Sequence, residues 1–171
     1  VDWLKLQAAW NKYMELPSPE NADAVSICLP DSGFVDYDNS PLENEVIDSI
    51  SAQSGMLEMQ VITSDSAAVL LAFRLFTIAD GAFGESLCIM LGKLIRINPE
   101  LFLYELKANE NIVVRLDALV GNQGYEYLDR IKAEEYDIER RIKALQSVKN
   151  KDLQSVRDEC VEELRKQLSL Y

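Results

Sequence analysis

Hydrophobic side chains recur every three or four residues along most of this chain, which is the spacing of α-helices that bury one face. Polar residues suited to a helix N-cap stand directly before four of these stripes: Asp2, Ser18, Ser40 and Asn98. A proline follows three of these caps at the first helical position. Proline is favourable there because the N–H that it lacks would have no partner within the helix. The pattern therefore predicts helices that begin at residues 3, 19, 41 and 99.

The third helix raises a question about where it ends. Its buried stripe runs from Leu42 to Ile50, and Gly55 is expected to stop it in a left-handed conformation. Residues 56–62 then alternate apolar and polar side chains, as a half-buried strand does. A single short strand has no partner for its ladder hydrogen bonds, so we interpret this segment as a further helix.

The centre of the chain is its most apolar part. Residues 67–79 are hydrophobic on nearly every side except at Arg74, which predicts a helix surrounded by others. We expect a structural role for Arg74, either paired with a carboxylate or reaching water, because a charge there needs compensation. Gly92 interrupts the next helix, predicted over 83–97. Glycine costs about 1 kcal/mol relative to alanine in a helix interior, so we expect a close helix–helix contact there.

The last part of the chain predicts two longer amphipathic helices joined by a short turn, an antiparallel hairpin over 124–171. Opposite charges four residues apart support these helices, at Asp137/Arg141, Glu139/Lys143 and Glu162/Lys166. The fold class is therefore all-α, an irregular array of short helix pairs that ends in this hairpin. We expect one domain over 1–171, with an acidic helical part (1–66), apolar central helices (67–120) and the hairpin.

Successive short helix pairs around an apolar centre resemble HEAT-like solenoids in general shape. The sequence shows no repeat of fixed period, which is the usual signature of such solenoids. The resemblance therefore implies a stacked helical architecture and nothing about an activity.

The net charge is distributed unequally along the chain. Most of the net charge of −12 comes from residues 1–66, which hold twelve acidic residues against only Lys5 and Lys12. With a pI near 4.4, nucleic-acid binding is not expected, since it needs clustered cations that neutralise phosphates. The chain has no histidine, which excludes Ser-His-Asp and Cys-His catalysis and His-ligated zinc or haem.

The acidic residues suggest two kinds of site. A weak calcium candidate comprises Asp31, Asp36, Asp38 and Glu43. The calcium-loop pattern then fails, because Pro41 stands where it needs glycine and Ile47 where it needs glutamate. A face for docking a basic protein partner comprises Asp31, Asp36, Asp38, Glu43, Glu45 and Asp48. The alternative is that the negative charge only keeps the protein soluble.

The cysteines and the chain start bear on the compartment. Cys28, Cys88 and Cys160 are far apart and odd in number, so we expect free structural thiols. One Cys28–Cys160 disulfide is the alternative for an exported chain. The longest apolar run is too short for a membrane span, which needs about 20 residues. The first residue is not methionine, so a removed upstream segment is expected, and localisation and oligomeric state stay open.

Three functional hypotheses follow, none of which calls for a cofactor. The first is a non-catalytic helical interaction or scaffold domain with an acidic N-terminal face. The second is a small acidic inhibitor or immunity-type protein that binds a basic partner. The third is an enzyme that uses carboxylates such as Glu58 or Glu85 in a pocket, without metal or histidine. Six aromatic residues are expected mainly in the core, with an interaction groove as the alternative: Trp3, Trp10, Tyr13, Tyr125, Tyr127 and Tyr136.

Overall fold

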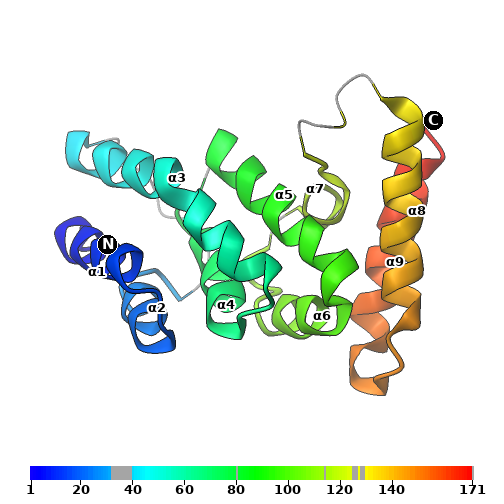
Figure 1. The fold of residues 1–171 in the computed structure, drawn as a ribbon, viewed down its shortest axis with the longest axis horizontal. Helices are drawn as coiled ribbons and strands as arrows, with labels where there is room; N and C mark the ends of the chain where they lie inside the picture. Colours follow the sequence, from blue (N-terminus) through cyan, green and yellow to red (C-terminus); the bar gives the residue numbers. More distant parts are fainter. Residues whose placement is uncertain (32–39, 80, 114, 125–126, 128–129, 171) are drawn as a thin grey trace.

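The computed structural model shows an all-α protein, as the sequence predicts, and its described residues contain no strand (Figure 1). The structure describes residues 1–31, 40–79, 81–113, 115–124, 127 and 130–170. These ranges hold nine α-helices and the 3₁₀ helix η2. In chain order the helices are α1 (Trp3–Glu15), α2 (Pro19–Ser26), α3 (Pro41–Ile62), α4 (Ser66–Leu75), α5 (Gly81–Ile97), α6 (Pro99–Ala108), α7 (Leu116–Gly121), α8 (Ile131–Ser147), η2 (Lys151–Leu153) and α9 (Gln154–Leu168).

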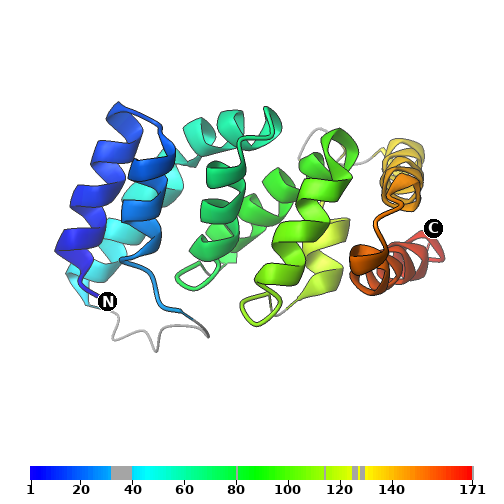
Figure 2. The ribbon, with the colours of Figure 1, turned by 90° about the horizontal axis from the view of Figure 1, so that it is seen from below.

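The first six helices stack in two layers along the long axis of the molecule. Helices α1, α3 and α5 contact one another in turn, and each also packs against its successor in the second layer, which consists of α2, α4 and α6. The pair α8 and α9 closes the far end, and α7 packs between α5 and α9. The two termini consequently lie at opposite ends of an elongated array (Figure 2). The helix pairs show no shared sequence repeat, so the resemblance to HEAT-like solenoids stays a prediction.

Local capping explains where several helices begin. Each of the four predicted N-caps is confirmed, because its side-chain oxygen accepts a hydrogen bond from the backbone N–H three residues later. These bonds join Asp2 to Lys5 (3.1 Å), Ser18 to Asn21 (3.3 Å), Ser40 to Glu43 (3.2 Å) and Asn98 to Leu101 (3.1 Å).

The expected helix stop at Gly55 is wrong. Helix α3 is 22 residues long and passes through Gly55 without a break. Residues 56–62 are therefore helical, as interpreted, but belong to the same helix. Leu57 and Val61 give the reason, since both are fully buried and extend the apolar stripe that begins earlier in α3. Tertiary burial of this stripe therefore outweighs the local preference of glycine. The left-handed residue beyond the helix is Ser64, with a φ of 64°.

Gly55 provides a direct test of this continuous helix. It is exposed, and a methyl group added there meets no atom within 4 Å. We expect Gly55→Ala to stabilise the protein by about 0.5–1 kcal/mol, because alanine has less backbone entropy to lose on folding. For a chain of this size the melting temperature rises by roughly 1–4 °C, which thermal circular dichroism measures. An unchanged or lower melting temperature would contradict a continuous α3.

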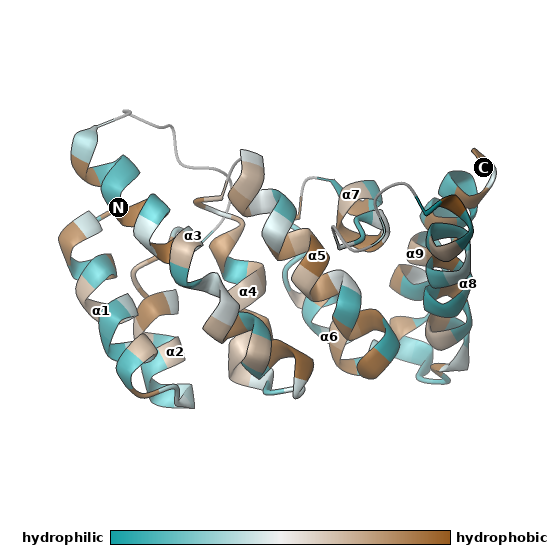
Figure 3. Ribbon diagram, turned by 45° about the horizontal axis from the view of Figure 1, so that its top comes forward, coloured by the Kyte–Doolittle hydropathy of each residue, from teal (hydrophilic) through white to brown (hydrophobic). Residues whose placement is uncertain are grey.

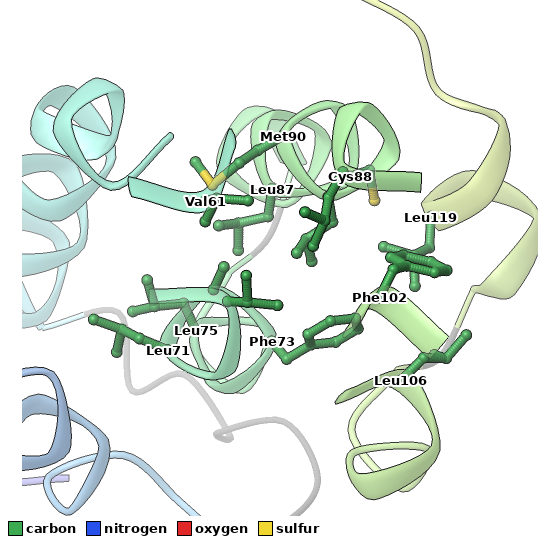
Figure 4. Close-up of a cluster of buried hydrophobic side chains, with 14 of the residues drawn as sticks. Val61, Leu71, Phe73, Leu75, Leu87, Cys88, Met90, Phe102, Leu106 and Leu119 are labelled. Carbon is green, nitrogen blue, oxygen red and sulfur yellow. The ribbon is translucent and has the colours of Figure 1, made fainter. Parts of the chain in front are cut away.

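One connected cluster of buried hydrophobic side chains includes residues from all nine described α-helices. Its centre lies among α3 to α7, where the rings of Phe73 and Phe102 pack with centroids 6.0 Å apart (Figure 4). Helices α4 and α5 carry mostly hydrophobic positions, whereas α8 and α9 are the most hydrophilic part of the array (Figure 3). No described helix combines the length and the apolar character needed to cross a bilayer.

The terminal hairpin is present as α8 and α9, which pack side by side (Figure 1). Its first helix begins at Ile131, later than the pattern suggests. Two of the three expected pairs form, Asp137–Arg141 at 2.8 Å and Glu162–Lys166 at 3.2 Å. The expected pair of Glu139 with Lys143 is not among the ion pairs of the described residues, which leaves this lysine without that partner.

Candidate functional site

The acidic residues that the sequence groups together differ in burial. Glu45 and Asp48 lie on the exposed side of α3, one turn apart. Asp31 is exposed as well, and it directly precedes residues 32–39, which lie outside the described residues. Glu43, in contrast, is 1% exposed, because it lies in the first turn of α3 with its side chain directed into the protein. Glu43 therefore does not contribute to a docking face.

The calcium hypothesis concerns residues that the structure describes only in part. Asp36 and Asp38 lie outside the described residues. Within the described ranges, no group of three or more cysteine or acidic side chains is placed to hold a metal ion. The Oε1 atom of Glu43 is buried without a hydrogen-bond partner among these residues. Calcium binding therefore stays a prediction.

Several exposed carboxylates of the N-terminal helices have no cation within 4.0 Å among the described residues. Ion pairs form at Asp31 and Glu58, whose cations come from later in the chain, Arg74 at 3.5 Å and Lys93 at 2.8 Å. Negative potential therefore remains over this end of the array. Apart from the N-cap Asp2, the exposed acids of α1–α3 with no cation within 4.0 Å among the described residues form the acidic N-terminal set: Glu15, Glu20, Asp23, Glu45 and Asp48.

Arg74 has the structural role that the sequence predicts, although its partners are mainly backbone carbonyls. Its Nη2 donates to the carbonyl oxygens of Leu29 at 3.3 Å and Pro30 at 2.7 Å. Its Nη1 donates to the carbonyl of Asp31 at 3.3 Å. These carbonyls follow the end of α2, where no further helical N–H groups are available to donate to them. Arg74 therefore links the end of α2 to α4.

A buried charge cluster joins α8 to the centre of the array. Asp137 and Arg141 are each 1% exposed, and Asp137 Oδ2 accepts a hydrogen bond from Arg141 Nε at 2.8 Å. Asp137 Oδ1 pairs with Arg96 Nη1 at 2.9 Å. Arg141 Nη1 also donates to the carbonyls of Val120 and Asn122, at 2.6 and 3.0 Å. Burial lowers the pKa of Arg141, while the charge of Asp137 acts against that shift.

Gly92 makes room for this cluster. A Cβ atom at Gly92 would lie 2.6 Å from Nη1 of Arg141 and 3.2 Å from the carbonyl oxygen of Asn122. The expected close approach is therefore present, but the neighbour is a buried arginine side chain and a backbone carbonyl. Sequence spacing reveals the Asp137/Arg141 pair, yet its burial depends on this glycine in a different helix. An analysis of each helix on its own therefore finds the pair but misses its burial.

An apolar pocket of about 400 Å³ opens beside α5 and α7. Cys88, Ile112 and Leu119 contribute to its lining, together with the exposed side chains of Glu85 and Arg115. Its size is within the range of small-molecule sites. Burial raises the pKa of Cys88 to about 11, so the thiol stays protonated near neutral pH and is a weak nucleophile.

The pocket offers little support for carboxylate-based catalysis. Paired-carboxylate chemistry needs two acidic groups across a cleft, and the described lining contains one, Glu85. Glu58 instead pairs with Lys93 at 2.8 Å. Burial does raise the pKa of Glu105, but this residue is in α6 and does not line the pocket. The carboxylates named for an enzyme therefore do not converge.

Most of the aromatic side chains that the structure describes belong to the core. Trp10 and Tyr13 are buried with ring centroids 5.8 Å apart, and Trp10 Nε1 donates to Gln53 Oε1 at 3.0 Å. Burial raises the pKa of Tyr13 to about 12. Of the other candidates, Trp3 and Tyr127 are half-buried, Tyr136 is exposed, and Tyr125 lies outside the described residues. Tyr104, which is not one of the six, is exposed as well.

The cysteines are free, as expected. Cys28 follows α2 and Cys160 lies in α9, and these helices occupy opposite ends of the array (Figure 1). That separation rules out the alternative Cys28–Cys160 disulfide, which needs Cα atoms within about 7 Å.

Comparison with protein-family models, with curated proteins and with solved structures gives no match to this chain. A functional assignment therefore rests on the charges, surfaces and cavities of this chain alone.

Proposed function

We propose that this protein is a non-catalytic helical interaction domain that docks a basic protein partner on its N-terminal helices. The observation that carries the proposal is the acidic N-terminal set, whose exposed carboxylates have no cation within 4.0 Å among the described residues. Complementary charge on a partner would remove this imbalance, speed the encounter and fix the orientation of binding.

In the terminal hairpin, several acidic side chains lie beside cations. In α9, Lys166 pairs with both Glu162 and Glu163, at 3.2 and 2.7 Å, and Arg157 pairs with Asp158 at 2.7 Å. Not every exposed acid beyond residue 66 is paired, but that part of the chain holds fifteen basic against seventeen acidic residues, whereas residues 1–66 hold two against twelve. Charge needed only for solubility has no reason to be distributed so unequally. This contrast supports a partner surface on α1–α3 over a general solubilising role.

A titration with a lysine- and arginine-rich peptide tests the proposal. The variant Glu45→Gln/Asp48→Asn removes two charges of the acidic N-terminal set, and Glu110→Gln/Glu159→Gln removes two exposed charges from the second half. We expect the first variant to bind the peptide about tenfold more weakly and the second to change affinity less than about twofold. Fluorescence anisotropy of a labelled peptide measures both, at low and at physiological salt.

The two variants have the same net charge, which makes the comparison decisive. If both lose affinity equally, only the overall charge of the protein matters and no docking surface exists on α3. Absence of peptide binding at low salt would contradict the proposal as well. Circular dichroism of both variants verifies that the exposed substitutions leave the helical fold intact.

A further inference from the structure

A groove of about 590 Å³ lies at the opposite end of the array, between α8 and the corner that joins α5 to α6. Helix α8 lines it with Tyr136, Arg140 and Lys143, which are spaced four and three residues apart and so share one face. The α5–α6 corner contributes Arg96 and Pro99. We call this cavity the α8 groove.

The α8 groove is positively charged, although the chain has a net charge of −12. Three cationic side chains line it against one carboxylate, that of Glu139. Arg140 and Lys143 are exposed, and neither forms an ion pair within 4.0 Å among the described residues. An anion entering the groove would therefore meet two cations, Arg140 and Lys143, that no described carboxylate already occupies, beside Arg96, which Asp137 also contacts.

Buried and stacked contacts fix the arginines of the groove. Asp137 holds Arg96 Nη1 at 2.9 Å, and Asp137 is itself held by the buried Arg141 at 2.8 Å. The Nε of Arg96 is buried without an acceptor among the described residues, so the hydrogen-bonding capacity of this guanidinium is incompletely used. Arg140 lies over the ring of Tyr136, 5.8 Å from its centroid, which restricts its rotamers. Such preorganisation reduces the entropy lost on binding.

The start of α6 adds to the positive potential. Pro99 lines the groove at the first position of this ten-residue helix. The N-terminal end of a helix carries a partial positive charge from its aligned peptide dipoles. This contribution supplements the three side chains, which carry the main charge.

We propose that the α8 groove binds the phosphate group of a small phosphorylated molecule. Planar guanidinium groups match phosphate oxygens in bidentate geometry, and lysine adds a point charge. A phosphomonoester carries a charge of about −1.5 to −2 at neutral pH. It therefore complements a site with two arginines and one lysine better than a ligand with a single carboxylate does. The volume also leaves space for the rest of a small ligand.

Arginine side-chain NMR tests this site with inorganic phosphate and pyrophosphate as probes at constant ionic strength. We expect pyrophosphate to shift the Nε–H resonances of Arg96 and Arg140 in a saturable way, while that of Arg74, which binds carbonyls beyond the end of α2, stays unchanged. The variant Arg140→Gln/Lys143→Gln is expected to weaken binding about tenfold or more, since each charge-assisted contact contributes substantially. The control Arg165→Gln/Lys166→Gln removes two exposed charges from α9 and is expected to bind as the unaltered protein does.

Three outcomes would overturn the proposal. The first is the absence of a saturable shift at Arg96 or Arg140. The second is an equal loss of binding in the two double variants, which would mean that the overall charge alone attracts the anion. The third is binding to vesicles of anionic phospholipid without binding to soluble pyrophosphate, which would assign the groove to a membrane surface. Binding of pyrophosphate alone, lost in the α8 variant, supports it.

Discussion

Replacing Asp137 with alanine is expected to destabilise the protein by about 3–5 kcal/mol, because Arg141 is then left as a buried charge without its partner. The loss includes the contact of Asp137 with Arg96 at 2.9 Å, which joins α8 to α5. The melting temperature falls by at least about 6 °C for a chain of this size. Urea denaturation monitored by circular dichroism measures the change in unfolding free energy.

A double-mutant cycle shows whether the Asp137–Arg141 pair accounts for this loss of stability. Asp137→Ala and Arg141→Met are measured singly and together. We expect the double variant to be more stable than the sum of the single losses predicts, by roughly 1–3 kcal/mol, because it leaves no unpaired buried charge. As a control, Glu162→Ala removes an exposed partner of Lys166 and is expected to change stability little. Strict additivity in the cycle would contradict the buried pairing.

Replacing Gly92 with leucine is expected to cost about 3 kcal/mol or more, the second large effect. The Cβ atom alone of such a side chain would lie 2.6 Å from Arg141 Nη1 and 3.2 Å from the carbonyl oxygen of Asn122. The arginine is not free to retreat, since it is held by Asp137 and two carbonyl oxygens. The larger side chain therefore forces overpacking and breaks buried hydrogen bonds.

Alanine at the same position makes the test more specific. Gly92→Ala is expected to destabilise the protein, whereas Gly55→Ala stabilises it, although both replace a helical glycine with the same residue. The difference in sign reflects contact alone, because Gly55 has no neighbour within 4 Å of an added Cβ. Thermal denaturation of the two variants side by side measures it. A stabilising Gly92→Ala would show that α5 and α8 do not approach as closely as described.

Local chemistry explains which parts of the fold are predictable from the sequence. Caps such as Ser18 and Asn98 act through hydrogen bonds to residues three positions later, so their effect is visible in a short segment. The end of α3 is not visible in this way, because Gly55 resembles a stop only when the burial of Leu57 and Val61 against other helices is unknown. Non-local packing decides there, and the sequence pattern does not contain it.

The candidate sites also combine features that the sequence reveals with features that only the packing of distant residues determines. Sequence counting finds the acidic excess of residues 1–66, but it does not show that Glu43 is buried while Glu45 and Asp48 are exposed. The α8 groove is harder to predict, because Arg96 and Arg140 belong to helices distant in the chain. Their convergence depends on the buried Asp137, which the spacing alone suggests as a surface ion pair.

The central functional claim is that a basic partner binds to the acidic N-terminal set on α1–α3 rather than to acidic side chains in general. Zero-length carbodiimide cross-linking tests it most directly, because it joins lysines of a bound basic peptide to the carboxylates they contact. Mass spectrometry then identifies the linked residues. We predict cross-links concentrated in the acidic N-terminal set, with Glu45 and Asp48 among the linked residues. Cross-links spread equally over exposed acids of the second half, such as Glu110 and Glu159, would contradict the claim.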